Sequence, residues 1–438
     1  MRKFEGKKLL LLGSNVGTLD LIRYAKDNGA YTIVADNLPV ERSFGKRYSD
    51  DHVMISTADI ESLKKYIQDN KIDGVFAGIS EFNLLKAMEL CHYFGFPFYC
   101  TREQWDLIEN KESFRNLCLK FDVPCPRTYF TGETVPKEIL NSIQYPVIVK
   151  PVDSSASVGV SICRDYQSLC EAVPEAIKNS EKGRIIIEEF FEGEEFTAHY
   201  TIINGKILLA SVDNRVSAAV HSGDVTTVPL ARIYPSTFIR EYIDQVNDKM
   251  IDLCFSLGMG FGVLFVQGLF NKEKNRFVIF EAGLRCAGEA PYRILEKTNG
   301  VSFMSGFVDY ALLGKVDSFL CENNDPYLHG KTACVISFVS KGGCIGNIFN
   351  YDDIELKVPS IVDKECRYRV GDMTPCGDTL RQIVLRFVLV CDSEELMVCD
   401  VETINNAIQV LDEKGEDMCY QFDVTAYMND RKKKLFLS

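Results

Sequence analysis

The sequence predicts a multidomain chain that is α/β at its N-terminus and α+β in its remainder. Three observations lead to this prediction. The 438 residues leave room for roughly three domains. Strand and helix patterns alternate over residues 8–100, and hairpins with isolated helices replace this alternation from residue 105 onward. We therefore expect domains at residues 1–104, 105–320 and 321–438.

Composition narrows the classes of function. The chain is 46% hydrophobic and 25% charged, as in an ordinary globular protein. Its formal net charge of −13 argues against a nucleic-acid partner, because phosphate backbones need a basic surface. No apolar run is long enough to span a membrane, so we expect no membrane partner and a cytoplasmic location. The 16 cysteines are then expected to be reduced thiols, and the absence of a C-x-x-C pair disfavours structural zinc.

The N-terminal alternation predicts a Rossmann-like parallel sheet with right-handed crossovers. The run Gly13-Ser14-Asn15-Val16-Gly17 follows the first strand, and Asp36 ends the second. This arrangement favours binding of NAD, FAD or a sugar nucleotide. The G-x-G-x-x-G fingerprint is absent, so a tight turn that uses glycine for backbone reasons is the alternative. Strands are expected at residues 8–13, 31–36, 73–78 and 96–100, with helices at 18–28, 59–69 and 81–94.

The stretch YPVIVKPVDSSASVGV at residues 145–160 contains a lysine at the end of an apolar strand. A buried strand such as 147–149 places Lys150 where its charge must find an anion or reach water. The small polar run from Asp153 to Gly159 can bring backbone N–H groups close to such an anion. The alternative is a lysine that reaches solvent beside a flexible turn.

The middle of the chain is rich in hairpins. Asn204-Gly205 is typical of a hairpin turn, and residues 331–424 contain several short strands. If the later hairpin turns near Lys274, then Gln267 faces Glu281 and Leu269 faces Ile279. Two facing oxygen-bearing side chains predict a Mg²⁺ site; a hydrogen-bonded pair that faces solvent is the alternative. Helices are expected at residues 166–178, 238–257 and near 402–413, and the later hairpin is expected at 261–270 and 276–285.

Acidic residues also interrupt an apolar strand in IIIEEFFEGEEF. Glu188 and Glu189 follow three isoleucines, Phe190 and Phe191 come next, and Glu195 lies beyond Gly193. An aromatic stretch bracketed by acids can hold a flat heterocycle and bond its amino group and sugar hydroxyls. The alternative is a strand that leaves the core.

Together these segments resemble the ATP-grasp superfamily, and most closely a single synthetase unit of the carbamoyl phosphate synthetase large subunit. The resemblance covers roughly residues 8–320. It implies an ATP-grasp fold with an N-terminal pre-ATP-grasp domain, a lid at about 127–195 and a small C-terminal α+β domain. The segments that carry it are NKESFR, PVIVKP, EEFFEGEEFT, VHSGDVTTVP and VQGLF with FVIFEAGLR.

The resemblance implies ATP and Mg²⁺ or Mn²⁺ as cofactors and assigns roles to matching positions. Phosphates would be held by Lys111, Lys150 and the loop residues Ser154, Ser155 and Ser157. Adenine and ribose would contact Glu188, Glu189, Phe191 and Glu195. Gln267 and Glu281 would bind the metal. Catalysis would use Arg285, Lys150 and His221.

The implied activity is ATP-dependent ligation of a small-molecule carboxylate, activated as an acyl phosphate, to an amine. The sequence leaves open whether the chain forms a homodimer. Gly283 stands where the family has an asparagine ligand, and Gly159 is the single glycine of the phosphate loop. These departures favour an alternative, a degenerate ATP-binding module without turnover. Candidates to hold substrate charges are Arg215, Arg232, Arg293 and Glu289.

Overall fold

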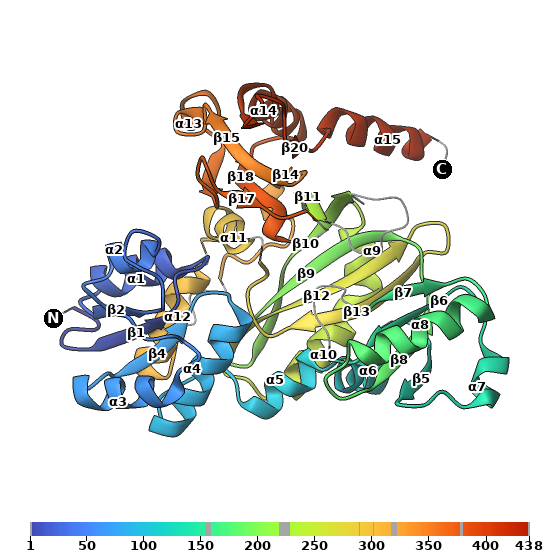
Figure 1. Cartoon of the computed structure of the whole chain (residues 1–438), viewed down its shortest axis with the longest axis horizontal. Coiled ribbons are helices and arrows are strands. Elements are labelled where there is room, and N and C mark those ends of the chain that lie inside the picture. The colour runs from blue at the N-terminus through green and yellow to red at the C-terminus, as the bar shows by residue number, and fades with distance from the viewer. Residues whose placement is uncertain are drawn as a thin grey trace.

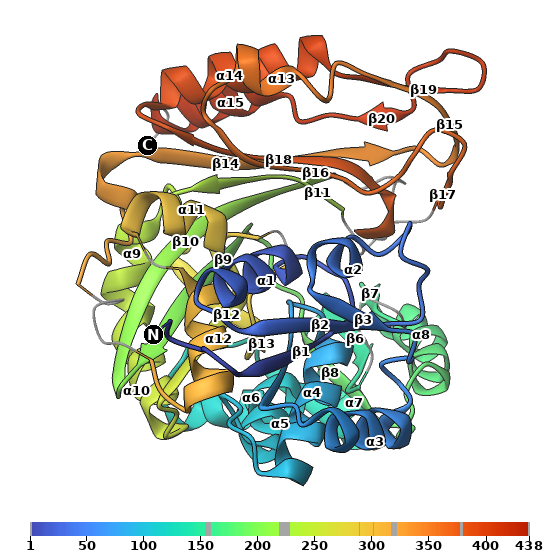
Figure 2. The ribbon, with the colours of Figure 1, turned by 90° about the vertical axis from the view of Figure 1, so that its left-hand side faces the viewer.

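The protein has three sheets of four or more strands and one smaller sheet, which Figures 1 and 2 show from two directions. The description rests on a computed structural model. It covers residues 2–153, 159–218, 228–288, 290–300, 302–316, 322–376 and 380–436. No helix in these ranges is both long and apolar enough to cross a membrane. Every cysteine in them is a free thiol.

The N-terminal sheet is parallel, as predicted, with strand order β3-β2-β1-β4. The four leucines at residues 9–12 of β1 are fully or almost fully buried, because helices cover both faces of such a sheet. Its strands are β1 (Lys8–Leu12), β2 (Tyr31–Ala35), β3 (Asp51–Val53) and β4 (Gly74–Ala77). Its helices are α1 (Thr18–Asp27), α2 (Phe44–Tyr48), α3 (Ile60–Asn70) and α4 (Glu81–Phe94).

The predicted strand at residues 96–100 is wrong, because this segment is irregular and leads into α5 (Arg102–Glu109). Its aromatic residues pack against the sheet instead, with the rings of Phe76 and Phe98 5.9 Å apart. A short apolar run cannot be assigned by periodicity alone. Helix α12 (Phe303–Leu313) returns to the same core, where Phe307 stacks on Phe76 at 4.8 Å.

A second, small sheet is antiparallel, with order β5-β8-β6-β7, and lies at the right of Figure 1. The predicted strand ending in lysine is confirmed, since β6 contains Lys150. Asp165 caps the predicted helix at 166–178, which is also confirmed. The elements are β5 (Thr128–Gly132), β6 (Val147–Pro151), β7 (Ser161–Cys163), β8 (Ile185–Glu189), α6 (Lys111–Lys120), α7 (Lys137–Ser142) and α8 (Tyr166–Lys178).

The central sheet has nine strands and runs from the middle of the chain into its C-terminal region. The Asn204-Gly205 turn is confirmed, and both residues have the positive φ that a type I′ turn needs. Strand β11 pairs with β14, which joins residues 231–234 to residues 333–336. The strands are β9 (Glu194–Ile203), β10 (Lys206–Ala218), β11 (Val228–Tyr234), β12 (Phe261–Asn271), β13 (Arg276–Gly283), β14 (Thr332–Ser340), β16 (Ile361–Cys366), β18 (Ile383–Cys391) and β20 (Cys419–Tyr420).

Helices cover the central sheet and the C-terminal region. The predicted helix at 238–257 is α9 (Ile239–Tyr242), a π-helical turn (Ile243–Asn247) and α10 (Asp248–Ser256) in succession. The helix predicted near 402–413 is displaced: α14 (Glu394–Ala407) begins at the cap Ser393, and residues 409–412 form β19 (Gln409–Asp412). The remaining elements are α11 (Tyr292–Asn299), α13 (Ile354–Lys357), α15 (Val424–Phe436), β15 (Gly343–Phe349) and β17 (Met373–Thr374).

Candidate nucleotide and metal site

Lys150 is part of a buried ion cluster with Glu188 and Arg115. The lysine Nζ lies 2.6 Å from Oε2 of Glu188, and the Arg115 guanidinium donates to Oε1 at 2.5 and 2.8 Å. The Glu188 side chain is 0% exposed and that of Lys150 10%. Arg115 also donates to the Ile279 carbonyl at 2.9 Å, so the cluster ties α6 and the small sheet to β13. Burial alone would raise the pKa of Glu188, but Lys150 and Arg115 hold it below its ordinary value.

This cluster changes the explanation for the buried lysine. The counter-ion of Lys150 is Glu188, so the strand needs no ligand to accommodate the lysine. Glu188 forms ion pairs with both Lys150 and Arg115. Its contact with adenine stays a prediction. The sequence analysis includes Arg115 only as the last residue of the segment NKESFR. The signal that would have found it is its spacing, four residues after Lys111 on the same helix face.

The β12–β13 hairpin places Gln267 opposite Glu281, as predicted. The predicted pair Leu269–Ile279 is wrong, because an irregularity after Gln267 shifts the register and Leu269 faces Val278. Glu281 is exposed, and neither side chain of the pair makes a hydrogen bond or ion pair with a described residue. Two oxygen-bearing side chains are therefore available on one face of the hairpin.

A polar row extends this pair across the central sheet. Gln267 faces Thr197 on β9, and Thr197 faces Asp213 on β10, so all lie on one face in register. Asp213 is fully buried and accepts from Arg232 at 3.0 Å. Arg232, a candidate for holding substrate charge, is itself buried and bonds Thr197 and Asp213. The sequence missed this row because its members lie on strands separated by tens of residues.

Lys111 and Arg285 are two basic residues near the hairpin: Glu281 acts on the charge of Lys111, and both Glu281 and Arg285 act on Glu109. Burial lowers the pKa of Lys111, while the negative charge of Glu281 opposes this effect and the positive charge of Lys150 adds to it. Arg285 lies 3.7 Å from Glu81, with its guanidinium 5.1 Å above the ring of Phe265. The charges of Lys150, Glu188 and Glu281 thus all act on Lys111.

Glu109 adds a carboxyl group that the sequence did not single out. It is the last residue of α5 and accepts from the Leu284 N–H at 3.2 Å. Burial raises the pKa of Glu109 to about 8, and the negative charge of Glu81 adds to the effect. No group of three or more His, Cys, Asp or Glu side chains in the described ranges is placed to hold a metal. Among the described residues, the side chains that could hold a cation at the hairpin are Gln267 and Glu281.

Comparison with known proteins gives consistent matches. A family profile described as D-ala D-ala ligase C-terminus matches residues 124–220. The carbamoyl phosphate synthase large chain, C-terminal section, of Methanocaldococcus jannaschii is 30% identical over 333 residues, which cover 71% of this chain and 52% of that relative. The corresponding large chain of Clostridium acetobutylicum is 25% identical over 304 residues, 64% of this chain and 28% of its own length. This chain therefore spans about half the length of the first relative and less of the second.

Solved structures share the fold. The L-amino acid ligase of Bacillus licheniformis has a TM-score of 0.74 at 16% identity, covering 93% of this chain and 99% of the ligase. Phosphoribosylglycinamide synthetase of Anaerococcus prevotii has a TM-score of 0.72 at 17% identity, with the same coverage of each chain. The chain belongs to the ATP-grasp superfamily. Its arrangement of a parallel N-terminal sheet and antiparallel central sheets is the ATP-grasp fold.

Gly283 shows how this ATP-grasp chain departs from the asparagine that the resemblance implies. A Cβ atom built on Gly283 would lie 2.5 Å from Cε1 of Phe265 and 3.1 Å from Oε1 of Glu109. Phe265 is buried, so a larger residue here has no room unless the ring moves. The ring and the carboxyl group of Glu109 thus occupy the space beside the hairpin into which a longer side chain would project.

Other expected ATP-grasp site residues are partly engaged by ion pairs. Glu189 pairs with Arg276 at 2.6 Å, and that guanidinium lies 5.1 Å above the ring of Phe191. Glu195 pairs with Arg215, a second candidate for holding substrate charge. Several predicted residues lie outside the described ranges, namely Ser154, Ser155, Ser157, His221 and Glu289.

Asp36 argues against the dinucleotide alternative. One carboxylate oxygen accepts from the Leu38 N–H and pairs with Lys46, each at 2.8 Å. The other accepts from the Ser43 hydroxyl at 2.7 Å, and the residue is 5% exposed. Because its oxygens are already bonded within the protein, Asp36 is not available to a ribose.

Proposed function

We propose that this ATP-grasp chain is an ATP-dependent ligase. It would transfer the γ-phosphoryl group of ATP to a small-molecule carboxylate and join the resulting acyl phosphate to an amine. The observation that supports this is that three charges act on Lys111: that of Glu281 in the hairpin pair with Gln267, and those of Lys150 and Glu188 in the ion cluster. The names of the relatives, among them an L-amino acid ligase and a carbamoyl phosphate synthase, agree with this class of reaction.

The residues present fit a hard divalent cation such as Mg²⁺ or Mn²⁺. Gln267 and Glu281 offer an amide and a carboxylate oxygen on one face of the hairpin, the ligand types that such cations prefer. Glu81 adds negative charge near Glu109, and a bound cation would favour ionisation of the Glu109 carboxyl group, whose pKa burial raises to about 8. When bound, the cation neutralises phosphate charge and aligns the reacting oxygens.

The protein residues would contribute positioning and positive charge rather than a nucleophile. A carboxylate is a poor electrophile, and conversion to an acyl phosphate supplies a good leaving group for the attack of an amine. Lys111 and Lys150 would contact the phosphate oxygens, and Arg285 would stabilise charge that develops on the carboxylate. Glu188 would hold Lys150 and Arg115 in place before ATP arrives, which lowers the cost of ordering them.

The first experiment is a screen for phosphate release. The chain is incubated with ATP and Mg²⁺ and with pools of amino acids, other small carboxylates and bicarbonate, with and without amines. We expect release to depend on one pool and to be lost in Glu281→Ala. The matched control is Glu273→Ala, at the exposed turn of the same hairpin, which should retain the activity. Substrate-dependent release that survives Glu281→Ala would contradict the proposed role of the hairpin.

A second candidate, ATP binding without turnover, is favoured by Gly283 and the filled space beside it. It predicts that labelled ATP binds tightly and that Glu281→Ala weakens this binding, while no pool releases phosphate. Product release against any pool would eliminate this candidate.

A further inference from the structure

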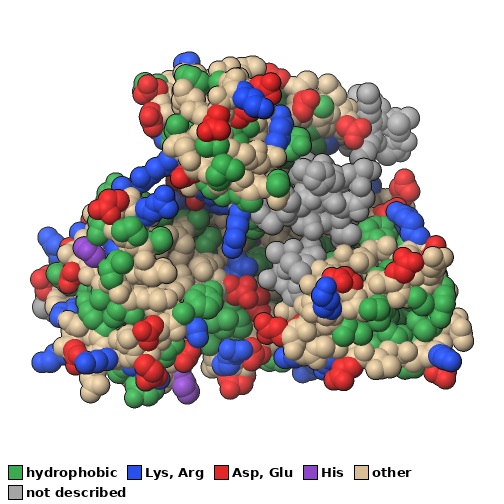
Figure 3. Space-filling view, viewed as in Figure 1, with side chains coloured by type: hydrophobic (Ala, Val, Ile, Leu, Met, Phe, Trp, Pro, Cys, Tyr) green, Lys and Arg blue, Asp and Glu red, His purple; other side chains and the backbone are tan. Residues whose placement is uncertain are grey.

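A large cavity lined by many charged side chains lies outside the hairpin site, between the N-terminal sheet and the C-terminal region. Its volume is ≈740 Å³, within the usual range for small-molecule sites. Residues 14–17 and α2 line one side, and β16 with the chain that follows it lines the other. Figure 3 shows basic side chains gathered where the C-terminal region overhangs the N-terminal region. We refer to this space as the arginine cavity.

The inner wall of the cavity is held by paired arginines. Arg386 has a 3% exposed side chain, lies 2.6 Å from Glu365 and donates to the Gly288 carbonyl at 2.7 Å. Arg293 lies 2.8 Å from Asp20 in the first turn of α1 and 3.7 Å from Asp363. These guanidinium groups are fixed in position before any ligand arrives.

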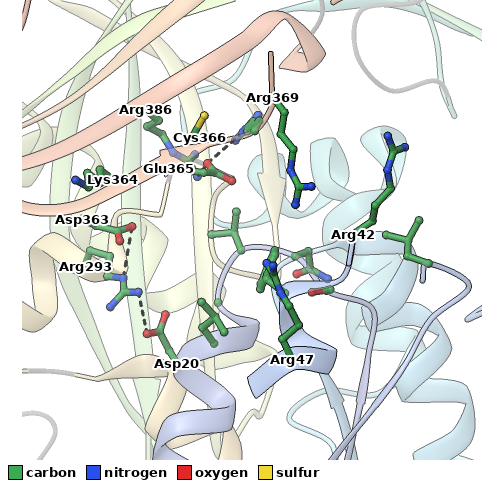
Figure 4. Close-up of a pocket in the computed structure, with 18 of the residues that line it drawn as sticks. Asp20, Arg42, Arg47, Arg293, Asp363, Lys364, Glu365, Cys366, Arg369 and Arg386 are labelled. Carbon is green, nitrogen blue, oxygen red and sulfur yellow. Dashed lines mark hydrogen bonds and ion pairs between the residues drawn. The ribbon is translucent and has the colours of Figure 1, made fainter. Parts of the chain in front are cut away.

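The outer wall carries two arginines, Arg47 and Arg369, that have no carboxylate partner among the described residues. Arg47 makes no hydrogen bond or ion pair with any described residue, and Arg369 donates from its guanidinium to the Glu41 carbonyl at 3.1 Å. Arg42 is 3.9 Å from Asp372 and largely exposed. Figure 4 shows Arg47 and Arg369 reaching toward the same space from opposite sides, with Arg42 at its edge. Gathering like charges is unfavourable unless an anion or solvent compensates them.

The charge balance of the lining indicates a dianion. Lys364 is paired with Glu355 at 2.8 Å, outside the lining, so it does not count toward the balance. Six arginines then face four carboxylates, which leaves a surplus of two positive charges. A phosphate monoester carries a charge of about −1.5 to −2 near neutral pH. Arginine is also the side chain best suited to phosphate, because its planar fork binds two oxygens together.

The turn after β1 adds to this environment. Gly13 and Gly17 both have positive φ, and Gly17 is the N-cap of α1, so the helix begins at the cavity wall. Helix N-termini attract negative charge. Asp20 in this first turn would oppose that attraction, but Arg293 and the Tyr292 hydroxyl engage its carboxylate.

We propose that the arginine cavity binds the phosphate group of a small phosphorylated molecule. That this molecule is a substrate of the ligase rests on the proposed function; the phosphate binding does not. Arg386 contacts the carbonyl of Gly288, three residues beyond Arg285, so the cavity adjoins the loop that carries the proposed catalytic arginine. One substrate would then be held by its phosphate end while its carboxylate or amine reacts near Arg285.

The test is direct binding to the full chain, measured by calorimetry with three probes: inorganic phosphate, glycerol 3-phosphate and succinate. We expect glycerol 3-phosphate to bind, with affinity that falls as salt is raised. Arg47→Gln together with Arg369→Gln should weaken its binding about tenfold or more, since each replacement removes a charge-assisted contact. Arg102→Gln, which removes an exposed arginine paired with Asp106, is the matched control and should bind as the unmodified chain does.

Two comparisons make the outcome decisive. Glycerol 3-phosphate should still bind to Lys150→Met, because Lys150 lies outside the arginine cavity. If the ligand bound at the nucleotide site, this variant would lose the binding. Equal affinity for succinate, or unchanged affinity in the double variant when its melting temperature is normal, would overturn the proposal. If phosphate release is found but the double variant leaves KM unaltered for every substrate, the ligase proposal stands and the bound phosphorylated molecule is not its substrate. If glycerol 3-phosphate binds as expected but no pool supports turnover, the cavity proposal stands and the ligase proposal fails.

Discussion

The buried ion cluster and the arginine cavity use basic side chains in opposite ways. In the cluster, Lys150 and Arg115 share one fully buried carboxylate, so their charges are compensated within the protein. In the cavity, Arg47 and Arg369 have no carboxylate partner among the described residues. The difference suggests that the cluster stabilises the fold and orders a site in advance, whereas the cavity retains positive charge for a ligand.

The largest expected effect is from Lys150→Met. If the cluster also serves catalysis, turnover should fall at least ~10²-fold, the usual cost of removing one charge-stabilising donor. The measurement is the phosphate-release assay with the substrate pool that supports activity. Lys178→Met, at an exposed position on α8, is the control and should leave turnover unchanged. Unchanged turnover in Lys150→Met would restrict the cluster to a structural role.

Glu188→Gln tests the cluster as a stabilising element. It leaves two buried cations without their counter-charge, so the free energy of unfolding should fall by about 3 kcal/mol or more. Denaturant unfolding measures this change. Glu189→Gln, which disrupts a more exposed pair, should cost no more than about 1 kcal/mol. Equal losses in the two variants would remove the distinction between buried and surface pairing.

The pH dependence of stability sharpens the same comparison. Because the folded-state pKa of Glu188 lies below its ordinary value of 4.5, its stabilisation is complete above that pH and is lost as the pH falls through the folded pKa. The gap in unfolding free energy between the unmodified chain and Glu188→Gln should therefore narrow below pH 4.5. Its limiting slope is about 1.4 kcal/mol per pH unit for one proton. Parallel stability curves in that range would contradict the assignment.

The smallest effect is expected in the arginine cavity. Arg47→Gln removes a like charge from the ligand-free cavity, so stability should be unchanged or increase by up to about 0.5 kcal/mol. Thermal unfolding at low salt, with and without glycerol 3-phosphate, measures this. The ligand should raise the melting temperature of the unmodified chain more than that of the variant. A clear loss of stability in the ligand-free variant would show that Arg47 has a structural role like that of Arg115.

The sequence predicted features formed by neighbouring residues better than those formed at a distance. The pairing of Gln267 with Glu281 follows from one short turn, so counting residues located it. The same count failed for Leu269, because a bulge between the pairs changes the register. The arginine cavity joins Arg47 to Arg369, more than three hundred residues later, and no local pattern marks either position.

The pairing of β11 with β14 has a consequence for any attempt to divide the protein. Residues 231–233 pair with β10 on one side, and residues 231–234 pair with residues 333–336 on the other. A chain shortened at residue 330 would present this backbone, with the apolar Ala231 and Ile233, as an open edge. Such an edge is a template for pairing with another copy. The C-terminal region therefore protects the rest of the chain from self-association, and a shortened protein should form aggregates or strand-paired dimers.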